Sequence, residues 1–195
     1  MIPFASVDTT ALRWLRTSEA PVAYELRSGD DLIARLSRAR HGGSLVHAET
    51  SEGSWTLKRV GFLHPRVTAR KEGAPGDVAV LDIHWRRTSV RVGNGRSFAF
   101  ERAGLAVPAW QFLTADGVRL VHIEPVRSGR SLVGGAVSVG PSGTRLAELP
   151  VLLLVGWYYI MQEWFEDEAV AAGEALLEAS AGPSPPKQPG ETQSP

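Results

Sequence analysis

Short apolar runs alternate with turn residues from residue 21 to residue 139. Apolar and polar positions alternate over 55–58, 66–70 and 79–85, with Trp85 the last apolar position of that third run. A period of two places alternate side chains on opposite faces of a β-strand. The rhythm predicts about eleven to twelve strands, one for roughly every ten residues, which is typical of an antiparallel sandwich or barrel.

Two hairpin signals and one further strand support this prediction. Asn94-Gly95 lies between two alternating runs, where a two-residue turn needs positive φ at both central positions. Trp110–Leu113 and Val118–Glu124 flank a second turn, and Ser131–Val139 forms a further strand that we expect to bend at Gly134-Gly135.

The pattern changes at Leu149–Met161, a run of thirteen apolar residues. Pro150 suits the first turn of a helix, where its missing N–H costs little. Thirteen helical residues rise about 20 Å, which is short of the ~30 Å hydrocarbon core of a bilayer. A helix that is apolar on every side must be buried on every side. The sequence therefore predicts a mainly β protein, a closed antiparallel β-barrel enclosing a hydrophobic C-terminal α-helix.

The remaining chain divides by composition. We expect residues 1–165 to form the barrel with its central helix at about 148–165. Residues 166–179 read as an acidic amphipathic extension, either a continuation of the helix or a second one. Residues 180–195 contain five prolines and no large apolar side chain, so we expect a disordered tail.

A strand meander followed by one apolar helix resembles the tubby C-terminal-like superfamily, which includes LURP-one-related proteins and phospholipid scramblases. The likeness covers roughly residues 20–165: 148–160 match the central helix, and 54–70 and 78–124 match barrel strands. It implies a closed barrel threaded by a helix and a non-enzymatic module, often associated with membrane or lipid. No phosphoinositide-binding motif of tubby proteins matches, and no acidic cluster beside the apolar helix specifically matches the scramblases' calcium site; Glu166-Asp167-Glu168 is the nearest candidate.

Charge is unevenly distributed along the chain. The formal net charge is zero, yet residues 1–145 carry 20 basic and 13 acidic side chains, and residues 146–195 carry 1 basic and 8 acidic ones. Zero net charge disfavours nucleic acid as a partner. The absence of cysteine excludes disulfides and thiolate sites. The sequence shows no secretory leader pattern, and we expect a cytoplasmic protein, peripherally associated with membrane if it binds lipid.

Strand phase places a set of arginines on outer faces or in turns. They are the candidate lipid- or partner-binding residues, and they comprise Arg66, Arg70, Arg86, Arg87, Arg91 and Arg96. Anionic lipid head groups are one ligand for such a surface, and an acidic protein partner is another. Solvated, scattered charge is the plainer interpretation.

Other chemistry is weakly signalled. His122 with Glu124, and Asp82 with His84, share strand faces and could begin a metal site, although solvated side chains explain them more simply. No G-x-S-x-G motif or phosphate loop is present, so we expect no enzyme activity and no cofactor. Two alternatives remain: a small-ligand barrel or enzyme with a site at a barrel mouth near His84, Trp85 and His122, and a scaffold that uses its acidic C-terminal segment.

Overall fold

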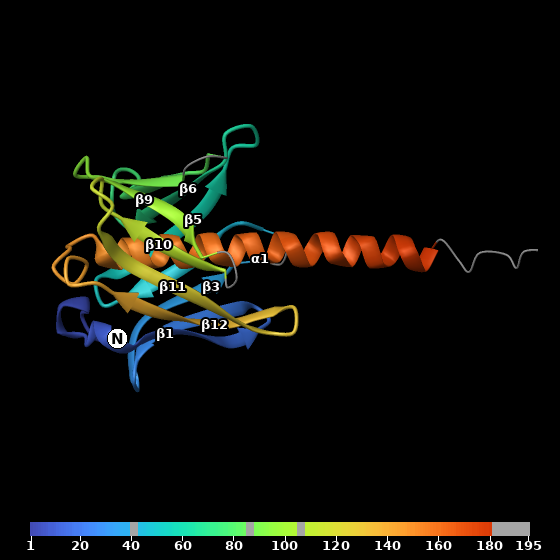
Figure 1. Cartoon of the computed structure of the whole chain (residues 1–195), viewed down its shortest axis with the longest axis horizontal. Helices are drawn as coiled ribbons and strands as arrows, with labels where there is room; N and C mark the ends of the chain where they lie inside the picture. Colours follow the sequence, from blue (N-terminus) through green and yellow to red (C-terminus); the bar gives the residue numbers. More distant parts are fainter. Residues whose placement is uncertain (40–42, 85–87, 105–107, 181–195) are drawn as a thin grey trace, which may run out of the picture.

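The computed structural model describes residues 1–39, 43–84, 88–104 and 108–180, with side chains as far as residue 165 apart from that of residue 5. Twelve antiparallel strands close into a barrel around one helix, as the sequence predicts (Figure 1). Two short 3₁₀ helices, Phe4–Ser6 and Thr9–Ala11, precede the first strand. The strands are β1 (Leu12–Glu19), β2 (Val22–Ser28), β3 (Asp31–Arg38), β4 (Val46–Thr50), β5 (Gly53–Val60), β6 (Arg66–Lys71), β7 (Ala79–Asp82), β8 (Thr88–Val92), β9 (Ser97–Ala103), β10 (Ala109–Leu113), β11 (Arg119–Ser128) and β12 (Ser131–Val139).

Each strand pairs with the next along the chain, and β1 pairs with β12 to close the barrel. β1 was not among the predicted strands, because the alternating pattern of apolar and polar residues was traced only from residue 21 onward. Leu12 and Trp14 point inward and are buried, but Leu15 is 43% exposed on the outer face, so apolar residues occupy both faces of β1. Closure leaves the sheet without a free edge.

The helix α1 (Leu149–Ser180) fills the barrel. Leu152, Leu153 and Leu154 have no exposed surface, and neither do Trp157 and Ile160 farther along. Burial on all sides is what a helix without a polar face requires. α1 runs unbroken through 166–179, so that segment continues the central helix, and Figure 1 shows its last turns leaving along the barrel axis. Of the expected disordered tail, 181–195 lies outside the described residues.

The two ends of the barrel differ because α1 passes through it in one direction. We call the end where α1 begins the start mouth and the end where it leaves the exit mouth. In an antiparallel meander, odd-numbered strands finish at one end and even-numbered strands at the other. α1 follows β12, so even-numbered strands finish at the start mouth and odd-numbered strands at the exit mouth.

One local expectation is wrong. The hairpin after β8 is not a two-residue turn, since Val92 pairs with Arg96 and only Gly95 has a positive φ, of 84°. The Asn94 side chain accepts a hydrogen bond from the Arg96 amide, which stabilises a three-residue loop instead. β12 has the predicted bounds and runs through Gly134 and Gly135, and its register with β11 shifts next to Gly134. A Cβ at Gly135 would lie 2.7 Å from Cζ3 of Trp157, so this glycine makes room for the helix.

Tyr158 joins the buried helix to the wall near the exit mouth. Its hydroxyl donates a 2.5 Å hydrogen bond to the Ser44 carbonyl, and burial raises the pKa of the phenol to about 12. The phenol of an unfolded chain ionises near 10. Folding therefore favours the neutral phenol, and this contribution is complete below pH 10 and is lost as the pH rises towards 12.

We expect the wild-type protein to lose about 2 kcal/mol of stability from Tyr158 between pH 8 and pH 11.5. A Tyr158→Phe variant should be less stable at pH 8, because the hydrogen bond is gone, but should lose less of its remaining stability at high pH. Urea unfolding of both proteins at pH 8, 10 and 11.5 measures the difference. Parallel losses in the two proteins would contradict this assignment.

Candidate functional site

Four of the six candidate arginines are described, and all four are exposed on the outer surface. Arg66 and Arg70 lie on β6, Arg91 lies on β8, and Arg96 follows the hairpin turn between β8 and β9. Arg86 and Arg87 lie outside the described residues. The prediction that these arginines lie on outer faces or in turns is therefore confirmed for these four. The four side chains do not form one cluster, because they are distributed from one mouth to the other.

Two of these arginines face acidic partners on the wall. Arg70 donates to Asp77 at 3.1 Å, and Arg91 donates to Asp82 at 2.9 Å. The arginine side chains remain 58% and 63% exposed, so water screens these pairs and each stabilises the fold by at most about 1 kcal/mol. Each acid nevertheless cancels the charge beside it, which reduces the attraction that these arginines exert on an anion.

Arg96 belongs to the start mouth. Its Nη1 donates to both carboxylate oxygens of Glu148, at 3.1 and 3.0 Å, and Asn94 donates to the same carboxylate. Burial of Glu148 favours the neutral acid, but the hydrogen bonds from Asn94 and Arg96 outweigh it and hold the pKa below its ordinary value. The carboxylate thus fastens the β8–β9 hairpin to the residue before α1, and Arg96 has a structural partner.

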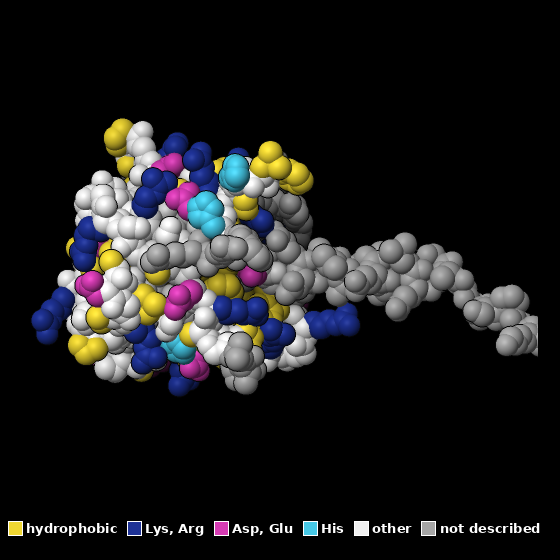
Figure 2. Space-filling view, turned by 45° about the horizontal axis from the view of Figure 1, so that its top comes forward, with side chains coloured by type: hydrophobic (Ala, Val, Ile, Leu, Met, Phe, Trp, Pro, Cys, Tyr) yellow, Lys and Arg dark blue, Asp and Glu magenta, His cyan; other side chains and the backbone are white. Residues whose placement is uncertain are grey.

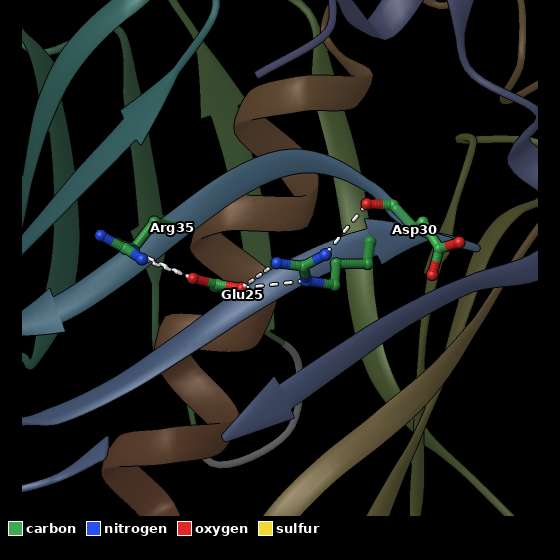
Figure 3. A network of polar contacts seen from close by, with 4 residues as sticks. Glu25, Asp30 and Arg35 are labelled. Atoms are coloured by element: carbon green, nitrogen blue, oxygen red, sulfur yellow. Dashed lines mark hydrogen bonds and ion pairs between the residues drawn. The ribbon is translucent and has the colours of Figure 1, made fainter. Parts of the chain in front are cut away.

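A similar arrangement lies on the wall at β2 and β3 (Figure 3). Glu25, which is 4% exposed, lies between Arg27 and Arg35; its Oε2 accepts from Arg27 at 2.8 and 2.9 Å and its Oε1 from Arg35 at 2.6 and 3.2 Å. Arg27 also donates to the Asp30 carbonyl. The hydrogen bond from Arg35 is the main reason that the pKa of Glu25 is lowered. Both guanidinium groups are held across the strand pair by one carboxylate.

The exit mouth carries arginines of a different kind. Arg38, Arg102 and Arg127 place their guanidinium carbons 4.2, 5.7 and 3.7 Å from the ring centres of Phe165, Trp110 and Trp164, respectively. Arg66 and Arg130 lie at the same end, at the start of β6 and after β11. Among the described residues, none of these five arginines forms an ion pair. Three of the five contact aromatic rings, and such a contact does not neutralise the positive charge.

No local pattern in the sequence marks Arg38, Arg102, Arg127 or Arg130 as a group. The available signal was positional: Arg38, Arg102 and Arg127 stand at or within two residues of the ends of odd-numbered strands, and Arg130 follows β11. All such ends meet at one mouth once the meander closes. Predicting that these arginines lie at one mouth requires the correct number of strands, including β1, because the number decides at which end each strand finishes.

A hollow of about 610 Å³ lies at the exit mouth beside these arginines. Phe100, Trp110 and Tyr159 form its aromatic part, and His84, Glu101 and Arg102 contribute polar groups. The rings pack edge to face, with Tyr159 5.5 Å from Phe100 and 5.1 Å from Trp110 between ring centres. Of the residues expected at a mouth site, His84 lines this hollow, and Trp85 lies outside the described residues. His122 is on the β11 wall, where it bonds Glu124 at 2.9 Å.

Within the described part of the chain, no three acidic, histidine or cysteine side chains are grouped so that they could hold a metal ion. Over the same residues, no helix has both the length and the apolar character to cross a bilayer. The fold therefore defines a closed twelve-stranded barrel plugged by one helix, with a basic, aromatic exit mouth. No family model, curated protein or solved structure matches this chain.

Proposed function

We propose that the protein is a non-catalytic, tubby/scramblase-like binding module that associates with anionic membrane lipid through the arginines of its exit mouth. The barrel threaded by an apolar helix supports this proposal, because that is the architecture that the resemblance implies. Arg66 is the member of the original arginine set that carries over to this mouth.

One observation carries the proposal: five arginines gather at the exit mouth, and none of them forms an ion pair with a described acid. Arg70, Arg91 and Arg96 face carboxylates, and so do Arg27 and Arg35. Arg119 and Arg145, at or near the start mouth, also form no ion pair with a described acid, so the exit mouth differs in the number of such arginines and in their contacts with aromatic rings. Lipid phosphates supply the missing negative charge, and each Lys or Arg near an anionic surface contributes about 1 kcal/mol. Guanidinium groups also match phosphate oxygens in geometry.

Sedimentation with vesicles tests the proposal. We expect the protein to pellet with anionic and phosphoinositide-doped vesicles at low salt, to be released at high salt and to ignore neutral vesicles. An Arg66→Glu/Arg102→Glu variant should bind at least ~10-fold more weakly, since two favourable charges become repulsive.

The matched control is Arg119→Glu/Arg145→Glu, which changes net charge equally with exposed arginines at or near the start mouth. Equal losses in the two variants would show that overall charge matters and the exit mouth does not. Failure of the wild-type protein to pellet with any vesicle would refute lipid binding.

The hollow beside Trp110 supports a second candidate, a site for a small soluble ligand. Its aromatic walls and the exposed Arg102 suit a compound with a planar group and an acidic group. The volume lies in the range of small-molecule sites. Quenching of tryptophan fluorescence by such compounds in the absence of vesicles would favour this candidate.

A further inference from the structure

The loop between β5 and β6 displays two large apolar side chains to solvent. Phe62 is 97% exposed and Leu63 is 81% exposed, the two most exposed large hydrophobic residues described. Figure 2 shows hydrophobic side chains standing out at one edge of the barrel, beside histidine and Lys or Arg side chains. Burying apolar surface of this size would be favourable, so its display requires an explanation.

The local backbone holds these side chains outward. Val60 pairs with Arg66 at the base of the loop, and the Ile83 amide donates a 3.1 Å hydrogen bond to the Pro65 carbonyl. Gly61 has a φ of 84°, and a Cβ there would lie 2.5 Å from the His64 carbonyl oxygen. The loop therefore depends on a glycine for its tight path and is fastened at its base to the segment after β7.

The charges around the tip match an anionic surface. Lys58 on β5, His64 in the loop and Arg66 on β6 are all exposed. Asp82, the acid opposite Arg66 in the strand register, is bonded to Arg91. An apolar groove on a protein would also accommodate the two side chains. The flanking cations favour instead a ligand with an apolar interior and a negatively charged surface layer. A bilayer of anionic lipid has this arrangement.

The shape of the molecule gives a flat surface access to the loop. Figure 1 shows the loop after β5 standing off to the side of the barrel, away from the axis along which α1 leaves. A membrane can therefore meet the loop without meeting the end of α1 first. Arg66 lies at the base of the loop, where it would reach the phosphate level as the tip enters the interface.

We propose that Phe62 and Leu63 insert into the interfacial region of an anionic membrane and anchor the barrel there. This inference rests on the proposed function, because it names how the same mouth holds lipid. Charge attraction brings the protein to the surface, and the two side chains then add an apolar contribution that salt does not screen. Two such side chains correspond to a ~10- to 100-fold gain in vesicle affinity.

The absence of cysteine makes a direct test simple. A single Phe62→Cys variant, labelled with an environment-sensitive fluorophore, should brighten and shift to the blue on addition of phosphatidylserine vesicles. Lipids carrying a quencher on the acyl chain should quench it. The control label at Val118, which is 48% exposed before β11, should stay in a water-like environment.

Binding measurements complete the test. Phe62→Ser/Leu63→Ser should weaken vesicle affinity by ~10- to 100-fold and leave the melting temperature unchanged, since both side chains are solvated in the free protein. Leu15→Ser/Val118→Ser removes half-exposed apolar groups elsewhere and should leave affinity unchanged.

The outcomes separate this inference from the proposed function. If the wild-type protein pellets with anionic vesicles while the label at position 62 stays in water, insertion is refuted and charge-driven binding stands. If nothing pellets, both fail, and the exposed tip becomes a contact for a protein partner. Full affinity in the Phe62→Ser/Leu63→Ser variant would also overturn insertion.

Discussion

A Leu153→Asp variant of this protein is expected not to fold. Leu153 has no exposed surface and lies in the stretch of α1 that fills the barrel. Leu153 belongs to the hydrophobic core, and a lone buried carboxylate costs far more than a domain of this size has in reserve. We expect a loss of more than about 4 kcal/mol, enough to abolish cooperative melting.

Circular dichroism and a melting curve of the purified variant measure this effect. Leu63→Asp is the matched control, because it makes the same chemical change at a leucine that is 81% exposed, and its stability should change by less than about 0.5 kcal/mol. Leu153→Met keeps the volume and should cost less than about 1.5 kcal/mol. A soluble Leu153→Asp protein that melts cooperatively would disprove the placement of α1 inside the barrel.

Trp157→Ala is expected to produce the second largest effect. The Trp157 ring stacks on Trp14, with centres 5.4 Å apart and planes 7° apart, and meets Tyr24 edge-on at 5.3 Å. Removing so large a buried ring leaves a cavity between α1, β1 and β2. We expect a loss of about 3–5 kcal/mol, measured by urea unfolding.

The control for this prediction is Trp157→Phe. The Trp157 Nε1 is buried and has no hydrogen-bond partner among the described residues, so phenylalanine removes an unsatisfied donor while keeping a ring. The cost should fall well below that of alanine. Gly135→Ala should also cost less in the Trp157→Phe background, because the clash at 2.7 Å involves the indole edge. Equal costs in both backgrounds would contradict this contact.

The sequence predicted the barrel and its helix because both rest on local signals. Alternation along 66–70 and 79–85 marks the inward face of a strand, and the run Leu149–Met161 has no polar face to place in water. β1 was not predicted as a strand because Leu15 breaks the alternation of apolar and polar residues and because its partner β12 lies more than a hundred residues away. The strand predicted from the alternation over 79–85 also ends sooner than expected. β7 stops at Asp82, and the Ile83 amide donates a hydrogen bond to the Pro65 carbonyl.

The candidate site was less predictable. Strand phase correctly placed Arg91 and Arg96 outside or in a turn, but their carboxylate partners depend on register and on the position of α1. Glu148 is 52 residues from Arg96 in sequence, and no local pattern joins them. The arginines of the exit mouth come from β3, β6, β9 and β11 and from the residues after β11, so only the closed barrel brings them to one end.

The order of the elements along the chain has a consequence for biosynthesis. α1 leaves the ribosome only after all twelve strands, yet its side chains occupy the space that those strands surround. The wall alone would line an empty lumen with apolar groups, and β1 must wait for β12 before the sheet can close. The nascent strands therefore have no stable structure to adopt until residues near 165 have emerged. Over that interval, a chaperone that shields extended apolar segments would have its greatest effect on yield.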